Sequence, residues 1–232
     1  MKIRSLLLLS LLAVPLAAQG HFSAADLKRE IDLSLRWLRY QQDLKTGSYG
    51  SVELTAMALK TFAESPRHYG ISDGPFISKA VGFLLRSQRP NGAICDPGAV
   101  DQQARMQSAD AAIALLRIGT PEVVAAAKRA ERFGGLFDPG DEWTPEDALA
   151  GFKTEDLLQQ ARDQLDRREP QGYWKSPMGR IFSTAMILER LSAYQQVIEG
   201  REKKDATPEP PQPLPTFSAG DRKKALKSLE RG

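Results

Sequence analysis

The chain of 232 residues is poor in the side chains that most metal and nucleophilic sites require. One cysteine and two histidines exclude an intrachain disulfide, and they exclude structural zinc sites of four cysteines or of two cysteines with two histidines. The sequence also lacks a glycine-rich phosphate loop, a Gly-x-Ser-x-Gly elbow and a His-Glu-x-x-His helix. Its 41% hydrophobic and 26% charged residues are ordinary globular values, which exclude a wholly disordered chain and a polytopic membrane protein.

Positive charge is scarce in the middle of the chain and concentrated at its ends. Residues 21–200 carry 22 basic and 24 acidic side chains, whereas residues 201–232 carry eight basic and five acidic ones. A nucleic-acid-binding domain normally gathers positive charge on its folded face, so we expect no nucleic-acid partner. The last 32 residues combine a proline-rich linker with a basic tail, which is either solvated and disordered or a docking peptide for an anionic partner.

Residues 1–20 have the three-part pattern of a secretory signal peptide. Lys2 and Arg4 form a basic start, an apolar run covers residues 6–14, and small residues follow. The pattern predicts cleavage after Ala18 or Gly20 and an exported protein, periplasmic or secreted. The apolar run is too short to span a bilayer comfortably, so we expect no stable membrane span, although an uncleaved anchor is the alternative.

Glycines recur at similar intervals through the body of the chain. The spacings between them are 45, 43 and 37 residues, and each glycine follows an amphipathic stretch and precedes a second helical stretch; the four are Gly47, Gly92, Gly135 and Gly172. A glycine ends a helix by adopting a left-handed backbone at little cost. The residues just after them are predicted to pack between hairpins: Tyr49, Ile94, Phe137 and Trp174.

Hydrophobic periodicity predicts eight helices and no strands. Their expected ranges are 26–42, 51–64, 76–88, 102–118, 121–133, 145–150, 153–168 and 179–198, so residues 21–200 form one all-α body. The second helix of each hairpin has a similar Ala-rich segment, and we align those beginning at Thr55, Ala111 and Thr184. Several apolar stripes are expected in the core: Ile77, Ala80, Val81 and Leu84; Met106, Ala109, Ile113 and Leu116; Ile181, Ala185, Leu188 and Leu191. Helix 26–42 has two stripes, one from Leu27, Ile31, Leu35 and Leu38 and one from Leu33, Trp37 and Tyr40.

The stretches from Gln88 to Gly92 and from Gly172 to Trp174 resemble the glutamine–glycine–tryptophan repeat of squalene cyclases and protein prenyltransferase β subunits. The resemblance covers about residues 26–198. It implies helical hairpins arranged as an α/α toroid with an inner and an outer layer. A complete toroid of this kind has about six hairpins. The four hairpins predicted here imply a partial or reduced toroid, open unless the chain self-associates.

The catalytic signatures of that superfamily are missing. No Asp-x-Asp-Asp or Asp-Asp-x-x-Asp run occurs, and the order of Cys95, Asp96, Asp101 and His68 does not match the zinc ligands of the prenyltransferases. We therefore expect no bound metal and no cofactor.

The candidate catalytic residues are Cys95, Asp96, Asp101 and Asp110. Cys95 could act as a nucleophile with His68 or be a small apolar residue, with the neighbouring aspartates capping turns. Asp110 could project into a lumen as an acid with a raised pKa or pair with Arg105 or Arg117.

The leading hypothesis is an exported, non-catalytic binding or scaffolding module that holds a ligand or protein on its concave face. One alternative is an isoprenoid cyclase- or transferase-like enzyme with replaced acids. A carbohydrate-active α/α enzyme is the other, with the loop Asp141-Glu142-Trp143 as a sugar contact.

Overall fold

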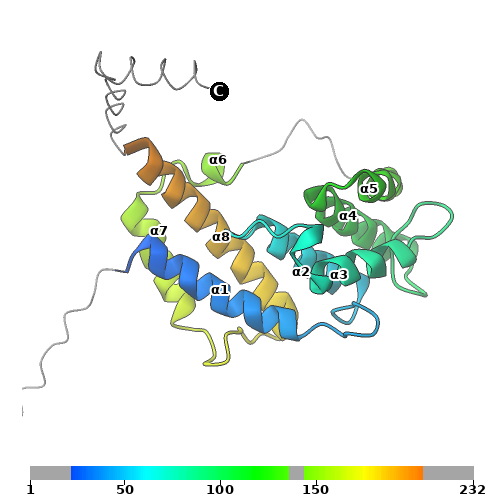
Figure 1. The fold of residues 1–232 in the computed structure, drawn as a ribbon, viewed down its shortest axis with the longest axis horizontal. Helices are drawn as coiled ribbons and strands as arrows, with labels where there is room; N and C mark the ends of the chain where they lie inside the picture. The colour runs from blue at the N-terminus through cyan, green and yellow to red at the C-terminus, as the bar shows by residue number, and fades with distance from the viewer. Residues whose placement is uncertain (1–21, 136–143, 206–232) are drawn as a thin grey trace, which may run out of the picture. The chain divides into compact units, whose positions relative to one another are not determined.

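The computed structural model describes residues 22–135 and 144–205, and these residues form an all-α structure (Figure 1). The helices are α1 (Ala24–Tyr40), α2 (Val52–Glu64), α3 (Pro75–Arg86), α4 (Asp101–Ile118), α5 (Pro121–Gly134), α6 (Pro145–Leu149), α7 (Thr154–Leu165) and α8 (Arg180–Asp205), with a 3-10 turn, η1, at Ile71–Asp73. The all-α prediction and all eight predicted helices are confirmed. Within the described ranges, extended pairing is limited to one isolated bridge between Gln88 and Ile94.

Some predictions fall on residues that are not described. The signal peptide, Phe137, the loop Asp141-Glu142-Trp143 and the proline-rich tail all lie outside the described residues. The chain divides into two units between residues 199 and 200, within α8, and nearly all described residues belong to the first unit. No helix in the described part is both long enough and apolar enough to cross a membrane.

Local sequence explains where the helices begin and end. Ser23 and Asp26 form a capping box at the start of α1, and the Ser51 hydroxyl accepts the Leu54 N–H at the start of α2. Gly119 and Gly135 end α4 and α5 with left-handed backbones. The end of α8 differs from prediction by seven residues, because Arg201-Glu-Lys-Lys-Asp205 favours helix and the first proline of the tail comes only at Pro208.

Three of the repeated glycines lie in turns with the same internal hydrogen bonds. Each glycine has a positive φ: +83° at Gly47, +94° at Gly92 and +98° at Gly172. Two residues later, a backbone N–H donates to a hydroxyl on the second helix of the hairpin; the pairs are Tyr49 to Thr55 (3.0 Å), Ile94 to Ser108 (2.9 Å) and Trp174 to Thr184 (3.2 Å). Tyr49, Ile94 and Trp174 are all buried, as predicted. The glycine turn therefore fixes the second helix of its own hairpin.

The same turns also attach each hairpin to a neighbouring helix. Gln42 Nε2 donates to the carbonyl of Phe76 in α3 (2.8 Å), and Gln88 Nε2 donates to that of Ala126 in α5 (3.0 Å). At the equivalent place in the last turn, Arg168 Nη1 donates to the carbonyl of Glu30 in α1 (3.0 Å). Each side chain donates a hydrogen bond to a backbone carbonyl of the neighbouring helix. The contact between neighbouring hairpins therefore includes hydrogen bonds as well as apolar packing.

These attachments give the order of the hairpins in space. The turn after α1 docks on α3, the turn after α3 docks on α5, and the turn after α7 docks on α1. The last hairpin of the sequence, α7–α8, therefore lies next to the first hairpin, α1–α2. On the other side, α2 contacts α4 extensively, and the Thr61 hydroxyl of α2 lies 3.5 Å from the Ala185 carbonyl of α8. The resulting rows are α7–α1–α3–α5 and α8–α2–α4.

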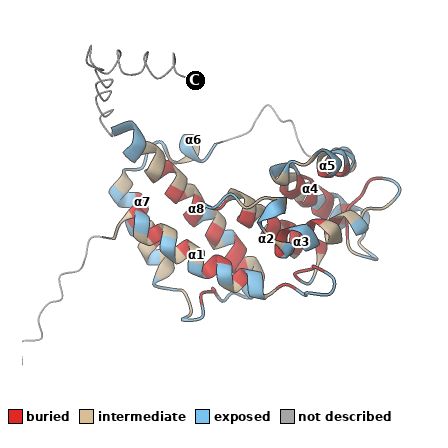
Figure 2. Cartoon of the chain, in the orientation of Figure 1, coloured by how far each residue is buried: buried red, intermediate tan, exposed pale blue. Residues whose placement is uncertain are grey.

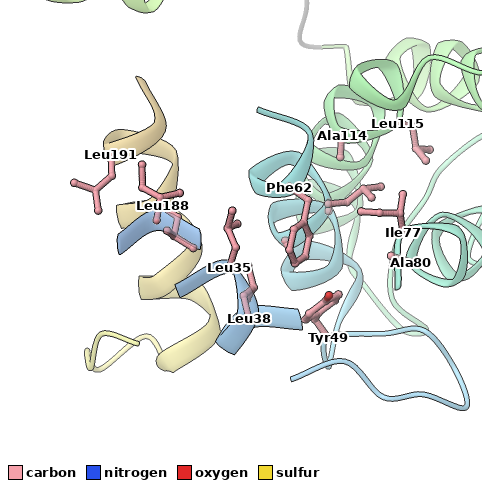
Figure 3. Packing of buried hydrophobic residues seen from close by; sticks show 14 of the residues in the cluster. Leu35, Leu38, Tyr49, Phe62, Ile77, Ala80, Ala114, Leu115, Leu188 and Leu191 are labelled. Carbon is pink, nitrogen blue, oxygen red and sulfur yellow. The ribbon is translucent and has the colours of Figure 1, made fainter. Parts of the chain in front are cut away.

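One hydrophobic cluster connects the two rows (Figures 2 and 3). It takes Leu35 and Leu38 from α1, Phe62 from α2, Ile77 from α3, Leu115 from α4 and Leu188 from α8, among others. The stripe Ile77, Ala80, Val81 and Leu84 belongs to this cluster, and so do Leu188 and Leu191; Ala185 is buried as well. Ile181 is only partly buried and packs at its edge.

Two predicted stripes are wrong as core stripes. On α1, the side with Leu27 and Ile31 is buried, but Leu33 is 43% exposed and Tyr40 is 77% exposed; only Trp37 on that side is covered, by stacking on Tyr173 at 4.8 Å. On α4, Met106 and Leu116 are exposed. The buried side of α4 instead carries small residues, which let α2 and α5 approach closely: Ala104, Ser108, Ala111, Ala112 and Ala114.

Candidate functional site

In three hairpins, the second helix has one stripe of side chains that faces away from the core. The turn hydrogen bonds make Thr55, Ser108 and Thr184 equivalent positions on α2, α4 and α8. Counting from them gives four levels of equivalent residues. They are Glu53, Met106 and Phe182; Met57, Asp110 and Met186; Lys60, Ile113 and Glu189; and Glu64, Arg117 and Ala193. We call these twelve residues the three-helix face.

Two cavities lie at the three-helix face. A cavity of about 1020 Å³ is bordered by its last two levels together with residues 68–70, Glu131, Thr144 and Pro145. A second cavity of about 230 Å³ is bordered by its first three levels, with Met106 the one residue of the face that borders neither cavity. Lys60, Ile113 and Glu189 border both cavities, so the third level lies between them. The larger volume is at the upper end of the range usual for small-molecule sites.

A network of ion pairs connects residues of the third and fourth levels of the face. Lys60 Nζ lies 3.2 Å from a carboxylate oxygen of Glu189 and 4.0 Å from one of Glu64. The other oxygen of Glu64 accepts from Nε of Arg117 at 3.0 Å. Burial raises the pKa of Glu189, and the Lys60 ammonium opposes that rise. The network links α8, α2 and α4 by charge at the two levels that border the larger cavity.

The first two levels of the face carry two carboxylates without such partners, those of Glu53 and Asp110. Among the described residues, neither Asp110 nor Glu53 has a hydrogen bond or ion pair from its carboxylate. Burial raises the pKa of Asp110, the Glu53 carboxylate raises it further, and the Lys60 ammonium opposes both. Asp110 borders the smaller cavity, next to Met57, Ile113 and Met186. It pairs with neither of its predicted partners, because Arg117 binds Glu64 and the Arg105 guanidinium lies over the Phe133 ring.

The other candidates from the sequence lie elsewhere. Cys95 is buried in a small cluster with Ala93 and Ala104, and burial raises the pKa of its thiol, which disfavours the nucleophilic thiolate. Asp96 is structural: its carboxylate accepts the backbone N–H of Val52 at 2.9 Å, at the start of α2, and the side-chain amide of Gln107 at 2.8 Å. Asp101 is the exposed first residue of α4.

The structure does not bring Cys95 and His68 together. Asp96, next to Cys95, bonds the first residue of α2, whereas His68 follows the last turn of α2 and borders the larger cavity. The 13 residues of α2 separate the two ends by roughly 20 Å. Across residues 22–135 and 144–205, no three histidine, cysteine, aspartate or glutamate side chains are grouped so as to hold a metal ion.

The three-helix face was only partly visible in the sequence. The alignment of Thr55 with Thr184 is correct, since both accept the same turn hydrogen bond, but the equivalent residue of α4 is Ser108 and not Ala111. A three-residue shift rotates a helix by only about 60° from a whole turn, so an apolar pattern hardly distinguishes the two alignments. With Ser108 in place, Met106, Asp110 and Ile113 move onto the face. A serine or threonine hydroxyl after each glycine turn was the signal that could have found it.

No family model, no curated protein and no solved structure matches this chain.

Asp110→Asn is expected to raise the melting temperature at pH 7 by roughly 1–3 °C. The folded state holds the pKa of Asp110 above its ordinary value, so the ionised form destabilises the fold at neutral pH. That penalty disappears as the pH falls through the pKa of the folded state, where the carboxyl becomes neutral. The effect stays small because the carboxyl is only half-buried and water screens it.

Thermal melts of both proteins between pH 7 and pH 4 provide the check. The difference between variant and wild type should shrink towards pH 4, whereas Glu122→Gln should not raise the melting temperature at either pH, because a carboxylate in the first turn of α5 stabilises that helix. A melting temperature that falls on Asp110→Asn at pH 7 would mean that the carboxylate stabilises the fold.

Proposed function

We propose that this chain is an exported, non-catalytic binding module and that its ligand occupies the three-helix face. The observation that carries this is the pair of cavities, about 1020 and 230 Å³, that share Lys60, Ile113 and Glu189. A hollow bordered by apolar side chains with a few convergent polar groups is the usual form of a ligand site. In this proposal the rows α7–α1–α3–α5 and α8–α2–α4 are the outer and inner layers of part of an α/α toroid, and the face is its concave side.

The electrostatics favour binding over cyclase chemistry. A cyclase-like site would use Asp110 as an acid, and its raised pKa together with the neighbouring Met57 and Phe182 supports that alternative. The charged side chains of Lys60 and Glu189 weigh against it, because both border the same cavity as Asp110 and keep that cavity polar. Carbocation chemistry instead needs an apolar lumen that excludes water.

A photo-crosslinking experiment tests the proposal. A benzophenone amino acid replaces Ile113, which borders both cavities, in the full chain expressed in its own host. A control chain carries the same group at Tyr40, which is 77% exposed on α1. After irradiation, mass spectrometry should identify an adduct at position 113 that the position-40 chain does not form. Equal adducts at both positions, or none at position 113, would contradict a ligand at this face.

Access to the cavity gives a second control. Ala193 borders the larger cavity from α8 and is not part of the buried core. An Ala193→Trp change fills space there without removing a charge. It should abolish the adduct at position 113 while leaving the helical circular dichroism unchanged. An adduct that persists would place the ligand outside the cavity.

A further inference from the structure

The three-helix face joins an unusual number of flexible apolar side chains to an excess of negative charge. Three of the five methionines of the chain lie on it, at Met57, Met106 and Met186, and Met106 and Met186 are 57% and 45% exposed. Phe182, Ile113 and Ala193 complete its apolar part. Methionine side chains adapt to irregular apolar partners, and a surface rich in them suits a peptide better than a rigid small molecule.

The charges on the face do not balance. Glu53, Glu64, Asp110 and Glu189 supply four carboxylates, against the two cations Lys60 and Arg117. Both cations are paired with carboxylates of the face itself. The surplus is therefore at the first two levels, where Glu53 and Asp110 are unpaired beside Met57 and Met186. A partner that covers these levels must bring positive charge, since two neighbouring carboxylates would otherwise be desolvated together.

The dimensions of the face suit one helix. Its stripe on α2 runs from Glu53 to Glu64, which is roughly 16 Å, or three helical turns. An amphipathic helix laid in a groove contacts it through side chains at i, i+3, i+4 and i+7. Three turns present about four such side chains, which is the number of levels on the face. The 230 Å³ cavity, which Asp110 and Glu53 both border, is large enough for one long side chain.

We propose that the partner of the three-helix face is a basic amphipathic helix of another protein, with apolar side chains on the methionines and a lysine or arginine between Glu53 and Asp110. This inference rests on the proposed function and names the class of its ligand. Association is electrostatically steered, so its affinity falls with ionic strength. Acidification also weakens it as Asp110 and Glu189 become neutral; the other charges that face them are Glu53, Lys60 and Glu64.

Binding of three fluorescein-labelled model peptides to the full chain tests the inference. The first is an 18-residue amphipathic helix of leucine and lysine. The second has the same composition in scrambled order, and the third has glutamate in place of lysine. Fluorescence anisotropy should show the first binding at least tenfold more tightly than either of the others, with affinity falling as salt is raised from 50 to 300 mM. Equal binding of the glutamate peptide would overturn the proposed charge, and equal binding of the scrambled peptide would overturn the helical form.

Variants locate the binding on the face. Asp110→Asn with Glu53→Gln should weaken the first peptide at least tenfold, whereas Glu122→Gln with Glu155→Gln, on exposed positions of α5 and α7, should leave it unchanged. Equal weakening by both pairs would mean that general charge, and not this face, binds the peptide. Helical circular dichroism of all variants should match the wild type, since none of the four positions lies in the core.

The alternatives give distinguishable results. If the peptides bind without discrimination while the benzophenone at position 113 still captures a ligand, the face is a site and the basic helix is wrong. If neither experiment gives a signal, the proposed function fails as well. Sedimentation velocity of the chain alone identifies the remaining occupant, a second copy: a dimer that Asp110→Asn dissociates would overturn a separate partner.

Discussion

Replacing Trp174 with alanine is expected to lower the free energy of unfolding by about 3–5 kcal/mol. The side chain is 3% exposed and lies between the helices of the last hairpin. Its backbone N–H donates to Thr184 of α8, and its indole Nε1 donates to the carbonyl of Gln164 in α7 at 2.8 Å. The alanine variant loses apolar burial, leaves a cavity and removes one of the hydrogen bonds that the Gln164 carbonyl accepts, while the bond from the Arg167 N–H remains. Denaturant unfolding followed by circular dichroism measures the loss.

Two further variants separate the contributions. Trp174→Phe keeps most of the packing and loses only the indole hydrogen bond, so it should cost about 1–2 kcal/mol. Tyr40→Ala removes a large aromatic side chain that is 77% exposed and should change stability by less than about 0.5 kcal/mol. A Trp174→Ala protein that is as stable as the wild type would show that Trp174 does not hold the hairpin together.

Gly47→Ala is expected to cost about 2–5 kcal/mol, for two reasons that add. The φ of Gly47 is +83°, a conformation that strains a residue with a side chain. In addition, a Cβ at this position would lie 2.3 Å from the carbonyl oxygen of Lys79 in α3. That contact is with backbone, so α3 must move away, and the bond from Gln42 to the Phe76 carbonyl would be lost with it.

A matched glycine isolates the second reason. Gly98 has nearly the same φ, +81°, but a Cβ there would meet nothing within 4 Å. Gly98→Ala should therefore cost only the backbone strain, about 1–2 kcal/mol. Chemical denaturation of both variants gives the difference. Equal losses would mean that close approach of the turn to α3 contributes nothing to the stability of the fold.

The two predictions act on different hairpins but on the same device. In each hairpin, a turn with a left-handed glycine holds the second helix through a backbone N–H and the neighbouring hairpin through a long polar side chain. The device positions the three-helix face, because Thr55, Ser108 and Thr184 set the level of every residue on it. A weakened turn should therefore disturb the face as well as the core.

The sequence by itself determined the helices and the glycine turns. The eight helices follow from apolar periodicity and from capping residues such as Ser51 and Gly119, which are local signals. Positive φ at Gly47, Gly92 and Gly172 likewise follows from the need to reverse the chain after a helix. Burial of Tyr49, Ile94 and Trp174 was predicted from their place after these glycines. Such features depend on residues close in the sequence, so a single sequence contains them.

Tertiary structure alone decided the order of the hairpins and the direction of each apolar stripe. Arg168 attaches the last hairpin to α1, more than 130 residues earlier in the sequence. Neither segment contains a sequence signal that identifies the other as its partner. The α4 stripe of Met106 and Ile113 looks like a core stripe, yet the core takes the alanine side of α4, since small residues allow α2 and α5 to pack closely. A periodic pattern shows that a helix has an apolar side. Which side is covered depends on the shapes of helices distant in the sequence, and so the three-helix face appeared only when all of them were in place.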